Sequence, residues 1–111
     1  MKERELIEKA IGWFNDLTQQ CERLTTANVS HQGATIRGKA KRCAEFIRKH
    51  KEQDTELLTL TASWFDGVAD HTTRLTTGNV SHQGATTRCL AREAANFLRD
   101  AIKEGEQHEI L

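Results

Sequence analysis

The sequence predicts an all-α protein, an up-down-up-down four-helix bundle built from two tandem helical hairpins. The 111 residues include no proline and few glycines, a composition that favours helices over strands. Apolar residues also recur at steps of three and four along four separate segments, which is the helical period. A chain of this length fits one compact domain, which we place at residues 1–111.

The chain aligns with itself after a shift of 51 residues, which pairs Trp13 with Trp64. The match is strongest where residues 23–35 meet 74–86, since only Ala27 against Gly78 differs there. Outside this window identity is patchy and mostly apolar, as expected where a core requires only size and hydrophobicity. We therefore assign repeat one to residues 1–51, repeat two to 52–103 and an acidic C-terminal tail to 104–111.

The apolar pattern predicts one helix before and one after the matched window in each repeat. We expect helices at residues 3–26, 31–50, 54–77 and 82–103. In the first helix the stripe that faces the core consists of Leu6, Ala10, Trp13, Leu17, Cys21 and Leu24. This placement favours core packing over base stacking for both tryptophans.

The residues around each loop resemble helix boundaries. Asn28 and Asn79 suit the left-handed position that ends a helix, and Ser30 and Ser81 suit the N-cap of the next one. Asp54 is the predicted N-cap of the third helix. Short connections make consecutive helices antiparallel, so both loops should emerge at one end of the bundle. A homo-oligomer formed by exchange of hairpins is also compatible with the sequence.

The charge is zero overall but unevenly spread. Residues 34–51 hold seven basic residues and one acid, whereas 52–77 hold five acids and one arginine. Mutual neutralisation between packed helices is the favoured interpretation, and a basic face for a polyanion is the alternative. The N-terminus lacks a signal peptide and no stretch could span a membrane, so we expect a cytoplasmic protein. Cys21, Cys43 and Cys89 are interpreted as reduced core thiols.

The matched window contains the candidate binding site. Helix N-termini bind anions through free N–H groups and a partial positive charge, glycine admits a ligand close to the backbone, and hydroxyl, imidazole and guanidinium groups surround it. The predicted ligand-binding residues are Arg23, Thr26, Asn28, Ser30, His31, Gln32, Gly33, Thr35, Arg37, Arg74, Thr77, Asn79, Ser81, His82, Gln83, Gly84, Thr86 and Arg88.

Metal binding and catalysis are disfavoured. The two loop histidines, His31 and His82, supply two ligands where zinc requires three or four. Ser30 and His31 are adjacent rather than facing, and the window holds no carboxylate to orient the imidazole. We therefore expect no enzyme activity, no catalytic residues, no metal and no cofactor.

The leading hypothesis is a small binding protein that uses its two loop sites to hold, and by analogy with phage counter-defence to sequester, a phosphorylated ligand such as a nucleotide or cyclic oligonucleotide. The first alternative is an inhibitor or adaptor that grips a host protein through both loops. The second is a DNA-binding pseudo-dimer, which the zero net charge disfavours. Recent duplication without divergence would also explain the matched loops.

Overall fold

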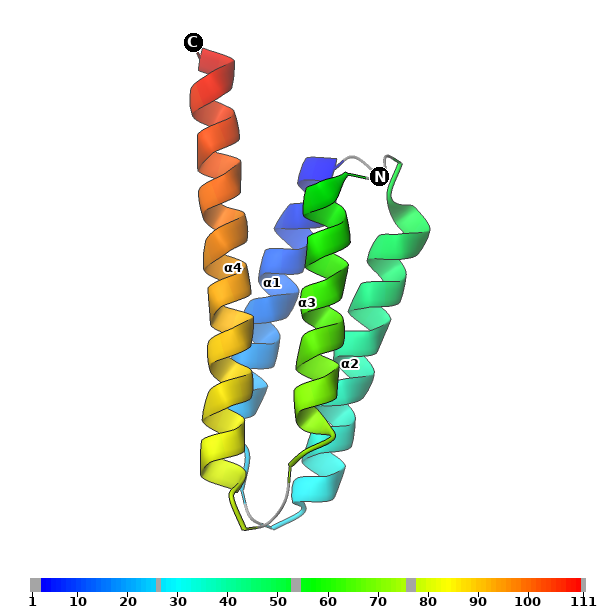
Figure 1. The fold of residues 1–111 in the computed structure, drawn as a ribbon, viewed down its shortest axis with the longest axis vertical. Helices are drawn as coiled ribbons and strands as arrows, with labels where there is room; N and C mark the ends of the chain where they lie inside the picture. Colours follow the sequence, from blue (N-terminus) through cyan, green and yellow to red (C-terminus); the bar gives the residue numbers. More distant parts are fainter. Residues whose placement is uncertain (1–2, 26, 53–54, 76–77, 111) are drawn as a thin grey trace.

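The described part of the chain forms four α-helices in a computed structural model, which confirms the predicted all-α class (Figure 1). Residues 3–25, 27–52, 55–75 and 78–110 are described, with backbone only from 105 onward. The helices are α1 (Glu3–Glu22), α2 (Val29–His50), α3 (Glu56–Thr72) and α4 (Val80–Ile110). They lie side by side as a four-helix bundle, and both repeated loops lie at the same end of it.

The main helix interfaces join the two repeats. Helix α1 packs most extensively on α4 and α2 packs most extensively on α3, whereas the two helices of each hairpin touch each other much less. Going around the bundle the order is therefore α1, α4, α3, α2, with every neighbour antiparallel. Because each helix finds its principal partner in the other repeat, neither hairpin has a complete core of its own.

The centre of the core lies between equivalent residues of the two repeats. Phe14 and Phe65 stack with ring centroids 3.9 Å apart and an interplanar angle of 1°. Both rings are fully buried. The remaining large core side chains come from all four helices and include Leu6, Leu17, Ile36, Ile47, Leu58, Val68 and Leu98.

The helices begin earlier than predicted after each loop. Asn28 is the N-cap of α2, with φ 62° and ψ 25°, and its carbonyl accepts a hydrogen bond from the Gln32 N–H at 2.9 Å. Ser30 and Ser81 therefore lie within the first turns of α2 and α4, so their assignment as N-caps was wrong. The left-handed conformation is confirmed for Asn28 but not for Asn79, since no other non-glycine residue in the described segments has a positive φ.

Helices α1 and α3 end earlier than predicted, at Glu22 and Thr72 rather than at 26 and 77. At the end of α1 the backbone N–H groups donate to the carbonyl three residues earlier, as in a 3₁₀ turn. These hydrogen bonds run from Arg23 N to Gln20 O and from Leu24 N to Cys21 O. The same pair of bonds ends α3, from Arg74 N to His71 O and from Leu75 N to Thr72 O. This tightening satisfies terminal carbonyls and turns the chain into the loop.

The start of α3 and the end of α4 also differ from the predicted boundaries. Thr55 is the N-cap of α3, because its Oγ1 accepts a hydrogen bond from the Leu58 N–H at 3.2 Å. The predicted cap, Asp54, lies outside the described residues. Helix α4 continues to Ile110, so residues 104–110 extend the last helix instead of forming a separate tail.

A glycine near the start of α2 and of α4 allows close contact with the other repeat. A Cβ added at Gly33 would lie 3.0 Å from Leu75 Cδ1 and 3.5 Å from the Thr72 carbonyl oxygen. At Gly84 the corresponding distances are 3.0 Å to Leu24 Cδ1 and 3.6 Å to the Cys21 carbonyl oxygen. The start of each second helix therefore rests against the end of the other repeat's first helix.

Two interpretations of the charged and sulfur-containing residues are corrected in part. All three cysteines are free, but only Cys21 is buried, whereas Cys43 is half-buried and Cys89 is exposed. Between α2 and α3, Arg48 forms an ion pair with Asp66. Arg37, Lys39, Lys41 and Arg42 form no ion pair within the described residues, so neutralisation by α3 is limited. None of the described helices has the length and apolarity required to cross a membrane.

The glycine contacts predict that the same substitution, glycine to valine, changes stability by very different amounts at different positions. Gly33→Val and Gly84→Val should each lower the free energy of unfolding by about 1–3 kcal/mol, because the new side chain overlaps Leu75 or Leu24. Gly12→Val is the matched control, since a Cβ there meets nothing within 4 Å. Urea unfolding measures all three, and equal stability of the Gly12 and Gly33 variants would contradict the proposed close contact.

Candidate functional site

The loop that joins α1 to α2 is stabilised by its own glutamine. Gln32 Oε1 accepts a hydrogen bond from the Thr25 N–H at 2.9 Å, and Gln32 Nε2 donates to Thr25 Oγ1 at 3.1 Å and to the Ala27 carbonyl at 3.2 Å. Thr25 Oγ1 in turn donates to the Ala27 carbonyl at 2.8 Å. Gln32 therefore has a structural role in the loop, whether or not it also contacts a ligand.

Other residues of the matched window are also engaged by the fold. Thr35 Oγ1 donates to the His31 carbonyl and Thr86 Oγ1 donates to the His82 carbonyl, both at 3.0 Å. Because Gly33 and Gly84 have no Cβ, the end of the other repeat's first helix packs against them. The sequence had instead suggested that a ligand approaches the backbone at these glycines. Identity between the loops is therefore explained in part by packing.

Four of the predicted residues of repeat one line a single cavity between α1 and α2. Arg23, His31, Gln32 and Thr35 surround it together with Gln20 and Ile36, and its volume is about 270 Å³. The Gln20 Oε1 atom is buried and has no hydrogen-bond partner among the described residues. The cavity thus presents a guanidinium and an imidazole to whatever enters it.

Three more of the predicted residues of repeat one face a different helix. Ser30, Gly33 and Arg37 line a hollow of about 250 Å³ together with Thr72 at the end of α3 and Thr73, its C-cap. The matched window is therefore divided between two faces of α2, one toward α1 and one toward α3. Each loop was predicted to form one site, and the spacing of its residues does not distinguish these two faces.

The described equivalents in repeat two lie just after α3, just before α4 and in the first part of α4. Arg74, Asn79, Ser81 and His82 are exposed, and Gln83 and Arg88 are half-buried. Arg88 Nε has no hydrogen-bond partner in the part of the chain that the structure describes. Thr26 and Thr77, which were also predicted to bind the ligand, lie outside the described residues.

The two segments that contain the loops and the first part of α2 and α4 are basic although the whole chain is neutral. Residues 23–44 contain five Lys and Arg residues and no acid, and residues 71–92 contain three and no acid. One of these cations, Arg92, lies 3.6 Å from Glu22 across the α1–α4 interface. The nearest carboxylates along the chain are Glu22 and Asp70, at the ends of α1 and α3, and Glu93, which follows Arg92.

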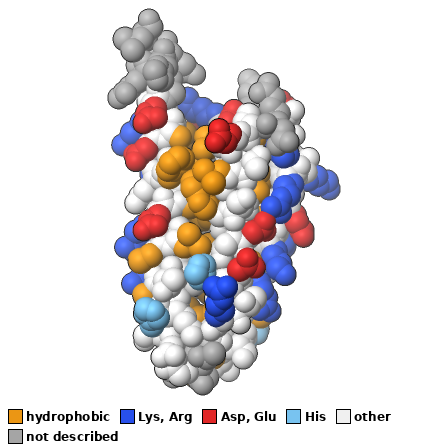
Figure 2. All heavy atoms as spheres, in the orientation of Figure 1, with side chains coloured by type: hydrophobic (Ala, Val, Ile, Leu, Met, Phe, Trp, Pro, Cys, Tyr) orange, Lys and Arg blue, Asp and Glu red, His pale blue; other side chains and the backbone are white. Residues whose placement is uncertain are grey.

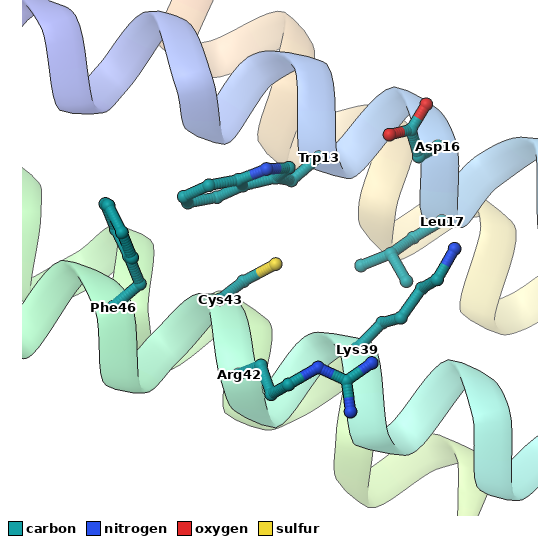
Figure 3. A pocket seen from close by; sticks show the side chains of 7 residues that line it. All are labelled: Trp13, Asp16, Leu17, Lys39, Arg42, Cys43 and Phe46. Carbon is teal, nitrogen blue, oxygen red and sulfur yellow. The ribbon is translucent and has the colours of Figure 1, made fainter.

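Sequence reasoning missed a larger cavity farther along the groove between α1 and α2 (Figure 3). It has a volume of about 320 Å³ and is lined by Trp13, Asp16, Leu17, Lys39, Arg42, Cys43 and Phe46. The sequence does hold a signal for this cavity. The repeats share the apolar pattern of these helices but differ in several charged residues. Lys39 of repeat one, for example, corresponds to Leu90 of repeat two.

Comparison with known proteins adds nothing to this geometry, since no protein-family model, curated protein or solved structure matches the chain. No group of three or more His, Cys, Asp or Glu side chains that could hold a metal ion occurs within the described segments. The site is therefore interpreted from its own residues.

The structural role of Gln32 gives a test that is independent of any ligand. Gln32→Ala removes three hydrogen bonds within the loop, so it should lower the free energy of unfolding by about 1–2 kcal/mol. Gln19→Ala, at an exposed position on α1, is the matched control and should have almost no effect. If the two variants unfolded at the same urea concentration, the bonds of Gln32 would contribute nothing to stability.

The three thiols should differ in reactivity. Burial raises the pKa of the Cys21 thiol to about 11 and also that of the Cys43 thiol to about 11, because the thiolate loses hydration. Exposed Cys89 should therefore react first with a disulfide reagent at pH 8. Labelling of Cys21 and Cys43 in the folded protein should accelerate as the pH rises toward 11. Equal rates for all three thiols, followed by mass spectrometry of peptides, would contradict this order.

Proposed function

We propose that the protein is a non-enzymatic binding protein that holds a phosphorylated small molecule at its loop end. The observation that carries the proposal is the cavity that Arg23 and His31 line together. These two residues come from the end of α1 and the start of α2, and the loop between them is held by separate hydrogen bonds. The recognition groups are thus distinct from the groups that build the loop.

The chemistry of the cavity suits a phosphate group. Guanidinium groups form two parallel charge-assisted hydrogen bonds to phosphate oxygens, and an imidazole supplies a further donor. The start of α2 adds a partial positive charge, and the Asn28 side chain makes no capping hydrogen bond to its first turn. Residues 23–44 contain no acid, and Glu22, which precedes Arg23, is paired with Arg92 at 3.6 Å.

The order of the helices favours two separate sites over one shared site. The cavity with Arg23 and His31 lies between α1 and α2, and the equivalent Arg74 and His82 belong to the ends of α3 and α4. In the bundle these two helix pairs occupy opposite sides. The cavity of repeat one, at about 270 Å³, lies slightly below the usual range for small-molecule sites, which suits a single phosphate-bearing group there.

A second candidate is a protein-interaction module, and it is favoured by an apolar surface away from the loops. Figure 2 shows hydrophobic side chains gathered between α3 and α4. Leu60 is 36% exposed and Phe97 is 50% exposed, with half-buried Trp64 packed edge-on against Phe97. Exposed large apolar side chains in one group are typical of contact surfaces between proteins.

Calorimetric titration with a panel of mononucleotides and cyclic dinucleotides tests the proposed function. We expect two equivalents of a phosphorylated compound to bind per chain, and Arg23→Ala with His31→Ala to reduce this to one. The double variant removes charge-assisted hydrogen bonds worth about 1.5–3 kcal/mol each, so affinity at that site should fall at least tenfold. Helicity and melting temperature should change little, since both side chains are exposed.

Lys9→Ala with Lys49→Ala is the control for charge. It removes two exposed cations at the opposite end of the bundle and should leave the stoichiometry at two. Equal weakening by both double variants would indicate nonspecific attraction. No heat and no thermal shift with any phosphorylated compound would refute the proposal, and stable co-purification of another protein would then support the second candidate.

A further inference from the structure

We propose that the cavity between α1 and α2 near the middle of the bundle is a second binding site, for a small aromatic anion. This site is separate from the loop-end site and is formed by repeat one alone. Its seven lining residues combine an apolar wall with two cations, and its volume is about 320 Å³. Small-molecule sites have volumes of about 300–1,000 Å³, so a ligand of one or two fused rings is the appropriate size.

The apolar part of the cavity is built from aromatic rings and a thiol. Trp13 meets Phe46 edge-on, with ring centroids 5.3 Å apart and an interplanar angle of 81°. Cys43 and Leu17 complete this wall (Figure 3). Burial raises the pKa of the Cys43 thiol to about 11, so this group stays neutral and behaves as an apolar surface at physiological pH.

The charged part of the cavity lies toward the loop end. Figure 3 shows the side chains of Lys39 and Arg42 reaching along the cavity from α2, with Asp16 opposite them on α1. Neither Lys39 nor Arg42 forms an ion pair with any described residue. Two cations against one carboxylate leave a net positive rim, which is complementary to one carboxylate or sulfonate group.

The second repeat provides an internal comparison. It keeps the aromatic wall, since Trp64 meets Phe97 edge-on at 5.2 Å. Asp16, Lys39 and Arg42 are replaced there by Gly67, Leu90 and Glu93. The aromatic pair is therefore part of the shared fold, whereas the charges are specific to repeat one.

The substitution at Leu90 also explains how the equivalent groove of repeat two is filled. Leu90 Cδ2 lies over Gly67, at 3.5 Å from the position that a Cβ of residue 67 would occupy. In repeat one, a lysine at the Leu90 position and an aspartate at the Gly67 position carry their charged ends toward the rim. The open, positively charged cavity thus depends on residue types that repeat two lacks.

Calorimetry with 2-naphthoate as the probe tests this proposal. We expect one equivalent to bind per chain, and binding of the uncharged 2-naphthamide to be at least tenfold weaker. In a Trp64→Phe background Trp13 is the single tryptophan, so its indole N–H resonance should shift during the titration and thereby locate the probe. Arg23→Ala with His31→Ala should leave this binding unchanged, which separates it from the loop-end site.

Exchange of residues between the repeats supplies the matched variants. Asp16→Gly with Lys39→Leu and Arg42→Glu installs the residues of repeat two and should weaken naphthoate binding at least tenfold. Lys41→Leu, exposed on the same helix and outside the cavity, should not change the affinity. The reverse exchange, Gly67→Asp with Leu90→Lys and Glu93→Arg, should raise the stoichiometry from one to two.

Three outcomes would overturn the proposal. The first is the absence of naphthoate binding at millimolar concentration to the unmodified chain. The second is equal affinity for 2-naphthoate and 2-naphthamide, which would show that the cations do not recognise the anion. The third is binding that moves the Trp64 resonance of the unmodified chain and leaves the Trp13 resonance in place, since the probe would then occupy the apolar surface of α3 and α4.

Discussion

The fold depends on the close packing of Gly33 and Gly84 against Leu75 and Leu24 of the opposite repeat. Each glycine lies near the start of a repeat's second helix and rests against the end of the other repeat's first helix. A larger side chain would push these elements apart, because Leu75 or Leu24 already occupies the adjacent space. The contact joins the repeats at the loop end, while the stacked Phe14 and Phe65 join them at the centre. The two hairpins are therefore parts of one cooperative unit.

This constraint changes how the identical loops are interpreted. Leu24, Gln32 and Gly33 have partners within the fold, so packing accounts for their presence in the loop without a ligand. Arg23 and His31 are exposed and form no hydrogen bond or ion pair among the described residues through their side chains. Their repetition is not explained by packing, and this difference is the reason to base the proposed phosphate site on them.

The fold was predictable because helical periodicity is local, whereas the partners of each helix are not. Spacing of apolar residues located the four helices and the short loops indicated their directions. The same spacing could not show that α1 packs mainly on α4, because both helices of a hairpin have similar stripes. The predicted start of α2 was wrong because Ser30 and Asn28 are both suitable N-cap residues. The helix begins directly after Asn28, whose backbone is left-handed. Packing at Gly33 likewise depends on a residue in the other repeat.

The charge differences between the repeats are visible in the sequence, but the cavity itself could not be predicted from them, because that requires knowing which side chains of α1 and α2 face each other. Weak packing within each hairpin leaves a groove, and the side chains at its edges decide whether the groove stays open. Leu90 covers Gly67 in repeat two, whereas Lys39 and Asp16 leave the corresponding space accessible in repeat one. Residues in these grooves contribute little to the main helix interfaces, which join α1 to α4 and α2 to α3. Side chains in the grooves can therefore differ between the repeats without disturbing the core, and the proposed site for an aromatic anion depends on this difference.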